Sequence, residues 1–492
     1  MINRSKYYIT TTLPYVNAKP HLGFALEIIQ ADVLARWQRS LGKEVFFNTG
    51  TDEHGLKIYQ KAAELGKTPQ EYCDESAEHF KALKEKLDLS FDNFIRTTDA
   101  HHIAAAQEFW KRCDANGDIY KKVYKAKYCV GCELEVTDSQ LVNGRCPIHP
   151  NKDVETIEEE NYFFRFSKYQ QPLLDFYNAN PDFVIPEGRF NEIKSFVAGG
   201  LQDFSISRVK EKMPWGIAVP GDEGQVMYVW FDALVNYISC LNWPEDEKKF
   251  EEFWGTKENR NAIQVAGKDN LRQQSAMWQA MLMSAGLPNS KQIFIHGFIT
   301  AGGQKMSKSL GNVIDPVRLV DKYGTDAARY FLLREISADE DGDFSYDRFE
   351  ERYNADLAKG IGNLAARVTT VAKKIGAAAN KEYANADLKK EAGSARAARD
   401  ESLAQYKFNE AIAAVWKLVN SGDRYIEQTQ PWKTKDAAAA GDLLLLLADF
   451  ADLIEPFVPQ TSAKIKSLLA GENRGILFPR LSNENRNVIP GD

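Results

Sequence analysis

Near the N-terminus, hydrophobic and polar positions follow a pattern that predicts a strand, a helix and a second strand. The run from Tyr7 to Thr12 is rich in β-branched and aromatic residues, and the prolines of the following segment LPYVNAKP end it. Apolar residues then recur at helical spacing as far as Gly42, a residue type that commonly ends helices; they are Leu26, Ile29, Val33, Trp37 and Leu41. The next segment, VFFNTGTDEHG, predicts a strand that ends in a loop.

Strand, turn, helix and strand in this order predict a βα unit of a parallel sheet. Ligands bind such sheets beyond the carboxyl ends of the strands, so we expect the loops after both strands to face a binding site. Two later apolar segments, IQVAGKDN and IFIHGFIT, predict further strands with polar or Gly-rich loops at their ends. The Cys-rich stretch from about Lys121 to Pro150 lacks this patterning, which predicts an insertion that splits the α/β domain.

The C-terminal part differs from the rest in composition. Beyond roughly Asp347 the chain is rich in Ala, Lys and Glu, and apolar positions recur at helical spacing through Leu443 to Phe457. This pattern is typical of a helical bundle. The expected fold class is therefore α/β, with a Rossmann-like split domain, an inserted subdomain and an all-α bundle at the C-terminal end.

Composition and charge narrow the class of protein. A chain of 492 residues that is 44% hydrophobic and 27% charged has room for several packed cores. The formal net charge of -7 speaks against a cationic surface for non-specific nucleic-acid binding. The first residues lack the apolar core of a secretory signal, and no later stretch is long and apolar enough to span a membrane. We therefore expect a cytoplasmic protein that does not bind membranes.

Three of the six cysteines lie in one short segment beside a histidine; the four residues are Cys129, Cys132, Cys146 and His149. They form two C-x-x-C/H pairs, and thiolates and an imidazole at this spacing can close the tetrahedron of a structural zinc site. Four protein ligands leave no open position, so one zinc ion per chain should fold the insertion as a zinc knuckle and take no part in catalysis. Coincidental clustering of free thiols is the alternative.

A candidate phosphate-binding motif, Pro20-His21-Leu22-Gly23-Phe24, lies between the first strand and its helix. Backbone N–H groups and the positive end of the helix dipole can hold phosphate oxygens there, and Gly23 allows a close approach. The His21 imidazole could donate a hydrogen bond to a phosphate whose charge grows in the transition state. An isolated His-x-Gly is more often an ordinary turn histidine.

A second basic motif, KMSKS, lies far downstream. Lys305 and Lys308 stand between Gly302-Gly303 and Gly311, which predicts a mobile loop whose two ammonium groups can close over a triphosphate. Taken alone, such a segment is more often a solvated surface loop. The presence of both motifs in one chain makes a nucleotide site the better interpretation.

The two motifs together resemble the HIGH and KMSKS signatures of class I aminoacyl-tRNA synthetases. Within that class, TTLPYVNAKPHLG, the loop GTDEHG and YVWFDALVNY are similar to the methionine-specific family, over residues 7 to about 435. The resemblance implies that L-methionine and ATP give methionyl-adenylate and pyrophosphate, and that methionine is then transferred to the 3′-terminal adenosine of tRNA(Met). Mg²⁺ would accompany ATP.

The resemblance also assigns residues to two substrates. ATP would be bound by His21, Gly23, Glu27, Gly267, Asp269, Lys305 and Lys308, and His21 and the two lysines would be catalytic through charge stabilisation. Asp52 would hold the ammonium group of methionine, and the pocket walls would be Leu13, Tyr15, Trp230, Ala233, Tyr237 and His296. Sulfur–aromatic contacts of about 0.3–1.5 kcal/mol each suit a thioether. Ordinary core packing is the alternative for the aromatic residues, and Arg208 either lies close to the site or forms a structural ion pair.

Three residues of the C-terminal part resemble the family's anticodon-reading surface. Asn363 and Arg367 lie one helical turn apart, so their side chains share a face, and Trp432 follows Pro431 farther on. An indole can stack on an unpaired base while an amide or guanidinium reads its edge. The alternative is that Asn363 and Arg367 are solvated and that Trp432 covers the bundle core.

The resemblance sets the expected domain organisation. The Rossmann-like catalytic domain would have two halves, the bundle would bind the anticodon, and the zinc knuckle and the KMSKS connector would be separate parts. The expected boundaries are 1–115 and 191–295 for the two catalytic halves, 116–190 for the connective insertion, 296–346 for the connector and 347–492 for the bundle. Because no dimerising domain is evident after the bundle, we expect a monomer.

Two departures from the family pattern keep other functions open. Phe24 replaces the second signature histidine, and Gln273-Gln274 stand where the family often carries an aromatic residue followed by histidine. Loss of one transition-state donor typically costs about a hundredfold to a thousandfold in rate, which favours a subfamily variant over an inactive protein. The alternatives are a non-tRNA adenylate-forming ligase of the HxGH superfamily and a tRNA-binding pseudo-enzyme.

Overall fold

The chain folds into two compact units, each built from separated stretches of sequence. The computed structural model describes residues 5–131, 134–136, 140–148, 150–306, 311–472 and 475–481. The first unit comprises Met1–Lys19, Glu44–Lys81 and Phe91–Ile295, and the second comprises Pro20–Lys43, Ala82–Ser90 and His296–Asp492. None of the helices within these described ranges is long and apolar enough to cross a membrane.

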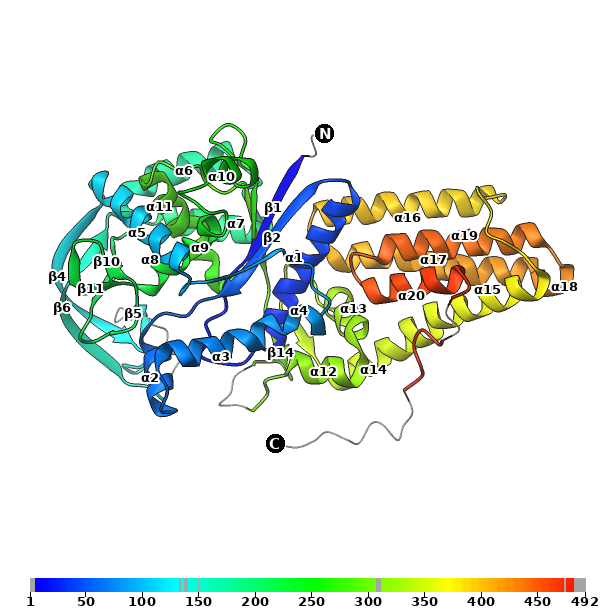
Figure 1. The fold of residues 1–492 in the computed structure, drawn as a ribbon, viewed down its shortest axis with the longest axis horizontal. Coiled ribbons are helices and arrows are strands. Elements are labelled where there is room, and N and C mark those ends of the chain that lie inside the picture. Colours follow the sequence, from blue (N-terminus) through cyan, green and yellow to red (C-terminus); the bar gives the residue numbers. More distant parts are fainter. Residues whose placement is uncertain are drawn as a thin grey trace. The chain divides into compact units, whose positions relative to one another are not determined.

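The first unit contains a six-stranded sheet, of which β1 and β2 are labelled in Figure 1. In spatial order its strands are β3 (Asn93–Arg96), β2 (Glu44–Thr51), β1 (Lys6–Thr11), β12 (Ala262–Gly267), β13 (Gln292–His296) and β7 (Val184–Ile185). The pairs of β1 with β2 and β12, of β2 with β3 and of β13 with β7 are parallel. This confirms the predicted parallel sheet, and β1 and β12 are buried almost throughout because both sheet faces are covered.

Helices and two small antiparallel sheets complete the first unit. Phe109 of α5 stacks on Trp278 of α11 with ring centroids 5.4 Å apart, and both rings are buried in its hydrophobic core. The longer helices are α2 (Leu56–Glu64), α3 (Pro69–Lys81), α5 (Ala100–Ala115), α6 (Gln170–Ala179), α7 (Glu187–Ala198), α10 (Glu247–Phe253) and α11 (Trp278–Ser284). One small sheet consists of β9 (Ser207–Val209), β10 (Ala218–Val219) and β11 (Asp222–Met227).

The Cys-rich insertion extends from a long antiparallel ribbon. Strand β4 (Ile119–Cys129) pairs with β6 (Val154–Phe164) along its whole length, and β5 (Leu134–Val136) and β8 (Phe204–Ser205) flank the pair. This sheet is separate from the parallel one. The prediction that the segment interrupts the parallel sheet is therefore correct.

Helix α1 (Leu22–Ser40) belongs to the second unit. It is buried on almost every side, and Gly42 follows its end with a φ of 85°, a conformation that glycine adopts without strain. The predicted helix and its glycine stop are thereby confirmed. The second unit also contains a small sheet of β14 (Ile299–Ala301), β15 (Gln304–Lys305) and β16 (Gly342–Phe344).

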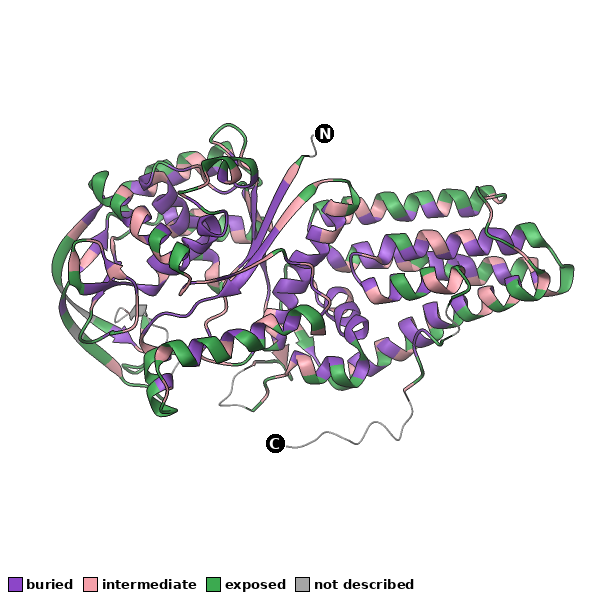
Figure 2. Ribbon diagram, in the orientation of Figure 1, coloured by how far each residue is buried: buried purple, intermediate pink, exposed green. Residues whose placement is uncertain are grey.

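The rest of the second unit is helical, as predicted. In Figure 2 the inner faces of the long C-terminal helices are buried and the outer face of α16 is exposed. Helix α17 packs against both α16 and α19. The helices are α4 (Leu83–Lys86), α12 (Pro316–Tyr323), α13 (Thr325–Glu335), α14 (Tyr346–Arg352), a π-helix (Tyr353–Ile361), α15 (Gly362–Ile375), α16 (Ala386–Ala404), α17 (Phe408–Thr429), α18 (Pro431–Thr434), α19 (Ala437–Ile454) and α20 (Pro459–Leu469).

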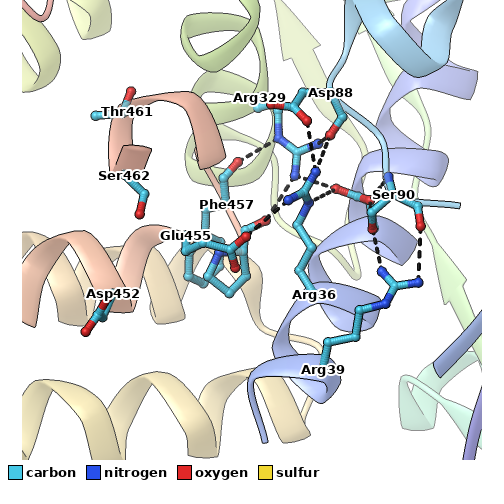
Figure 3. A network of polar contacts seen from close by, with 12 residues as sticks. Arg36, Arg39, Asp88, Ser90, Arg329, Asp452, Glu455, Phe457, Thr461 and Ser462 are labelled. Atoms are coloured by element: carbon cyan, nitrogen blue, oxygen red, sulfur yellow. Dashed lines mark hydrogen bonds and ion pairs between the residues drawn. The ribbon is translucent and has the colours of Figure 1, made fainter. Parts of the chain in front are cut away.

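A buried polar cluster ties α1 to the helical part of its unit (Figure 3). The Arg329 guanidinium donates to the Asp32 carboxylate at 2.8 Å and to the Phe457 carbonyl at 2.7 Å, and Arg36 donates to the same carboxylate at 2.9 Å. Burial alone would raise the pKa of Asp32, but Arg329, Arg36 and two hydrogen bonds from Ser90 hold it below its ordinary value. Such a pair is costly to break, because one charge would remain buried without its partner.

Candidate active site

The loops after β1 and β2 lie side by side in the first unit. The Asp52 N–H donates to the Pro14 carbonyl at 3.0 Å, and the Val16 N–H donates to the Asp52 carbonyl at 3.2 Å. These bonds form an isolated parallel bridge between Tyr15 and Asp52. Two residues that the sequence assigned to methionine are thus adjacent, as expected for loops that follow neighbouring parallel strands.

Glu53 fixes the loop that carries Asp52. Its fully buried carboxylate accepts two hydrogen bonds from Arg96, at 2.7 and 2.9 Å, and one each from Thr51 and Thr98, both at 2.6 Å. Bidentate arginine–carboxylate contacts are strong and directional. The loop is therefore held rigidly. The sequence does not predict these bonds, because Arg96 and Thr98 lie at the end of β3, 43 and 45 residues from Glu53.

Helices α8 (Val229–Ala233) and α9 (Asn236–Ser239) carry the other proposed pocket walls of the first unit. Ala233 is buried and Trp230 is partly exposed. Tyr237 is almost fully buried; its hydroxyl accepts a hydrogen bond from the Gln274 amide at 2.5 Å, and its carbonyl accepts one from the Tyr8 hydroxyl at 2.7 Å. Gln274, which departs from the family pattern, therefore orients Tyr237, a residue proposed to bind methionine.

Leu13, Gly267 and Asp269 lie around the same edge of the sheet. Leu13 packs against the hydrophobic cluster that includes Tyr237. Gly267 ends β12, which is hydrogen-bonded to β1, and Asp269 stands exposed in the following short 3₁₀ helix. Gly267 and Asp269 thus follow the carboxyl end of β12, and ligands of parallel sheets bind at this edge.

In the second unit, His21 caps helix α1. Its Nδ1 atom accepts hydrogen bonds from the N–H groups of Gly23 at 3.1 Å and Phe24 at 3.4 Å. A ring nitrogen that accepts carries no proton, so the neutral ring has its hydrogen on Nε2 and can donate from there. A Cβ at residue 23 would lie 3.0 Å from the His21 ring, so any other residue would require the ring to shift by a few tenths of an ångström. The turn-histidine interpretation and the phosphate-binding one are thus compatible.

Glu27 and His296, which the sequence assigned to different substrates, contact each other in the second unit. Both are buried, and His296 Nε2 lies 3.0 Å from a Glu27 carboxyl oxygen. His296 Nδ1 lies 2.7 Å from the Gly297 carbonyl oxygen, which can only accept, so Nδ1 carries a hydrogen. The Nε2 contact therefore requires one further proton, held by either the imidazole or the carboxyl group.

The KMSKS segment begins in β15, where Lys305 pairs with Thr300 of β14. Gly302 and Gly303 form the connecting turn with φ angles of 63° and 72°, and the Gly303 N–H donates to the Asp343 carboxylate at 2.8 Å. Both glycines adopt the left-handed conformation that the turn requires. Lys308 lies outside the described residues.

Two members of the predicted zinc set are described. Cys129 ends β4 and is buried, and Cys146 is also buried in the segment that follows β5. Cys132 and His149 lie outside the described residues, and among the described ones no cluster of three or more candidate ligands could hold a metal ion. The zinc site remains a prediction.

The proposed anticodon residues lie on α15 and α18 of the second unit. Asn363 is exposed, whereas Arg367 forms ion pairs with Glu427 and, at 3.1 Å, with Asp423, both on α17. Trp432 is half-buried on α18, which packs against α15. The charge of Arg367 is thus already balanced within the bundle.

Arg208 is buried between aromatic rings. Its guanidinium lies 4.4 Å from the centroid of the Tyr228 ring and 5.3 Å from that of Tyr128, and it donates to the Ser205 hydroxyl at 2.7 Å. A guanidinium over an aromatic face is attracted by the ring quadrupole. Arg208 therefore stabilises Tyr228, the residue immediately before α8.

The family of this chain follows from comparison with known proteins. A family model described as tRNA synthetases class I (M) matches residues 7–156 and 132–369. This match, the parallel sheet with its two adjacent loops and the helical C-terminal part define a class I aminoacyl-tRNA synthetase.

The curated relatives narrow the class further. A methionine–tRNA ligase from Thermosynechococcus vestitus is 44% identical, with 98% of this chain and 93% of the relative covered. One from Nostoc sp. is 42% identical over 100% of this chain and 94% of the relative. The solved structure of Mycobacterium tuberculosis methionyl-tRNA synthetase in complex with methionyl-adenylate has a TM-score of 0.89 and 36% identity, covering 97% of this chain and 100% of that one. The chain belongs to the methionine–tRNA ligase family.

Proposed function

We propose that this chain is a methionine–tRNA ligase. It forms methionyl-adenylate and pyrophosphate from L-methionine and ATP, and transfers methionine to the 3′-terminal adenosine of tRNA(Met). The observation that carries this proposal is the similarity to ligases of that specificity along nearly the whole chain. The similar solved structure contains methionyl-adenylate, the product of the first step, which supports the same chemistry.

Methionine is bound, in this proposal, by Asp52 and an apolar wall. The Asp52 loop is held by its bridge to Tyr15 and by Glu53, so a carboxylate is presented to the substrate ammonium with little reorganisation. The wall comprises Leu13, Tyr15, Trp230, Ala233, Tyr237 and His296. Aromatic rings favour a thioether over a purely aliphatic chain of similar length.

ATP is bound by backbone groups and donors that act on its phosphates. His21 donates from Nε2 while its Nδ1 caps the helix, so the ring keeps one orientation as charge develops on the phosphate. Lys305 and Lys308 supply positive charge, and Gly23, Glu27, Gly267 and Asp269 complete the site. Mg²⁺ bound to the phosphates would neutralise charge on the leaving pyrophosphate. The methionine carboxylate attacks the α-phosphate, so no side chain needs to act as a nucleophile.

In this proposal zinc binds to the Cys-rich insertion and the tRNA anticodon binds to the C-terminal helices. Burial of Cys129 and Cys146 suits thiolate ligands shielded from solvent, and Cys132 and His149 would complete the tetrahedron. Trp432 and Asn363 would contact the anticodon, and Arg367 would do so with the N–H groups not directed at α17.

The organisation of the chain is also part of the proposal. Catalytic halves at 1–115 and 191–295 would be joined by the insertion at 116–190, and the connector at 296–346 would lead to an anticodon domain at 347–492. We propose a monomer that works in the cytoplasm, where a reducing environment keeps the zinc thiolates intact. Light scattering on the eluted protein tests the monomer, and metal analysis of protein purified without added metal tests the zinc.

Methionine-dependent ATP–pyrophosphate exchange and charging of tRNA(Met) together test the function. Exchange with methionine alone among the class I amino acids, together with charging, is the expected result. Exchange without charging would favour the non-tRNA adenylate-forming ligase. Anticodon-dependent tRNA binding without exchange would favour the pseudo-enzyme, and attention would turn to Phe24.

A further inference from the structure

In the first unit, a fully buried carboxylate lies between two histidines. Asp232 has one carboxyl oxygen 2.7 Å from His54 Nδ1 and the other 2.8 Å from His102 Nε2. The second ring nitrogen of His102, Nδ1, lies 2.9 Å from the Ser239 hydroxyl oxygen. A carboxylate only accepts, so both rings donate to Asp232, and a neutral His102 ring then accepts from Ser239.

The charge of Asp232 depends on these partners. Burial alone would raise its pKa, but His54 and His102 hold the pKa below its ordinary value. An ionised carboxylate without donors in this place would be strongly destabilising. The three side chains therefore form one unit that cannot lose a member without rearrangement.

Each member belongs to a different segment of the chain. His54 follows β2 two residues after Asp52, and His102 lies on α5. Asp232 lies on α8 between Trp230 and Ala233. The ring of His54 also packs against Trp215, with ring centroids 5.4 Å apart, so its position is fixed from a second side. The hydrogen bonds thus join the segment with the ammonium-binding carboxylate to the segment with the proposed apolar wall.

We propose that Asp232, held by His54 and His102, is a positioning residue that sets the distance from Asp52 to Trp230 and Ala233, and so sets the length of side chain accepted. This inference rests on the proposed function, because it takes Asp52, Trp230 and Ala233 as methionine-binding residues. None of the three members needs to touch the substrate. They act by fixing the distance between Asp52, which holds the substrate ammonium, and the wall at Trp230 and Ala233, which holds the end of the substrate side chain.

Side-chain length is hard to discriminate by apolar contact alone. One methylene in a hydrophobic pocket changes selectivity only by about 10- to 200-fold, and only if the walls do not adjust. A wall joined to the ammonium anchor by charged hydrogen bonds resists such adjustment. Loosening that link should therefore alter selectivity more than it alters the use of ATP.

Matched substitutions at the two histidines test the inference. In His54→Asn the side-chain NH₂ group takes roughly the place of Nδ1, and in His102→Gln it takes roughly the place of Nε2. Both variants therefore keep a donor to Asp232. His54→Leu and His102→Leu remove it. The measurements are exchange kinetics with methionine, with the shorter homocysteine and with the longer ethionine, each with the KM for ATP.

For the leucine variants we expect the KM for methionine to rise by roughly 10- to 100-fold and discrimination against ethionine and homocysteine to fall, at a nearly constant KM for ATP. The Asn and Gln variants should stay within about threefold of the parent, since one hydrogen bond is kept. Leucine variants with unchanged methionine KM and selectivity would overturn the inference. So would an equal rise in the KM for both substrates, which indicates a general loss of structure.

Asp232→Asn serves if the leucine variants do not fold. It keeps the size of the side chain and removes the charge, but the amide offers one acceptor oxygen in place of two, so the hydrogen bond from one of the two donating histidines is lost. A folded Asp232→Asn variant with parental selectivity would overturn the inference, and a relaxed selectivity would support it. If the unmodified chain shows no methionine-dependent exchange, the proposed function itself fails, which is a distinguishable result.

Discussion

The residues proposed to bind methionine and those proposed to bind ATP differ in how they are held. Within the first unit, Asp52, Ala233 and Tyr237 are buried and are fixed directly or through neighbours by hydrogen bonds at 2.5–3.2 Å. By contrast, His21 of the second unit is exposed at a helix terminus, and Asp269 is exposed in a short 3₁₀ helix of the first unit. Among these residues, those proposed to bind methionine are the more firmly held.

This contrast follows from the chemistry of the two ligands. A thioether offers only shape and weak contacts, so its selection requires walls that do not move. Phosphates are charged, so backbone N–H groups, a helix terminus and ammonium groups attract them over some distance. In catalysis these donors must stabilise the charge that develops in the transition state. We therefore expect substitutions on the methionine side to change specificity and those on the phosphate side to change rate.

The largest effect is expected from Asp52→Ala. Loss of the carboxylate leaves the substrate ammonium without its partner, which should cost about 3–4 kcal/mol, or roughly a hundredfold to a thousandfold in kcat/KM for methionine. Steady-state exchange at varied methionine checks this, with the KM for ATP as an internal reference. Asp74→Asn, at an exposed carboxylate that accepts from Arg96 at 2.7 Å, is the control. A wild-type methionine KM in Asp52→Ala would remove Asp52 from the binding site.

His21→Ala should lower the exchange rate by about a hundredfold, with little change in the KM for methionine, because one transition-state donor is lost. It should also destabilise the chain by about 1 kcal/mol, since α1 loses its cap. His21→Asn separates the two roles, because asparagine caps helices well but places no donor where Nε2 lies. Thermal unfolding should recover in His21→Asn while exchange stays low. Recovery of both would leave His21 with a capping role only.

The sequence predicted local structure well because local patterns determine it. The strand–turn–helix around His21, the glycine after α1 and the helical C-terminal part follow from periodicity and turn residues. Contacts between distant residues left no such signal. His54, His102 and Asp232 meet across separate elements, and Glu27 meets His296 in the same way. A buried polar network depends on tertiary packing, so a single sequence predicts its residue types but not its partners.

A smaller effect is expected from Phe24→His, which restores the second signature histidine. Phe24 lies in the first turn of α1 and its N–H donates to His21, so the orientation of the His21 ring is already fixed without a histidine side chain at position 24. We expect exchange to change by less than about tenfold, well below the effect of a missing transition-state donor. Single-turnover adenylate formation is the measurement, with His21→Asn as the low-activity reference. A gain of a hundredfold would show that Phe24 limits the enzyme.

The last expected effect is on stability and not on activity, and concerns the second unit in acid. Because the folded-state pKa of Asp32 lies below its ordinary value of 3.8, its ionised form stabilises the folded chain above that value, and this stability is lost as pH falls through the folded pKa. Removing the charge with Asp32→Asn should lower the free energy of unfolding at pH 7, because Arg329 loses its ion pair with Asp32 and Arg36 keeps only those with Asp88 and Glu455. The gap between variant and parent should narrow below about pH 4. Urea unfolding of both proteins from pH 3 to pH 7 measures that gap. A gap that stays constant across the range would mean that the arginines do not stabilise the ionised carboxylate, and α1 would then be held by apolar packing and by its other polar contacts, such as the ion pair of Arg36 with Glu455.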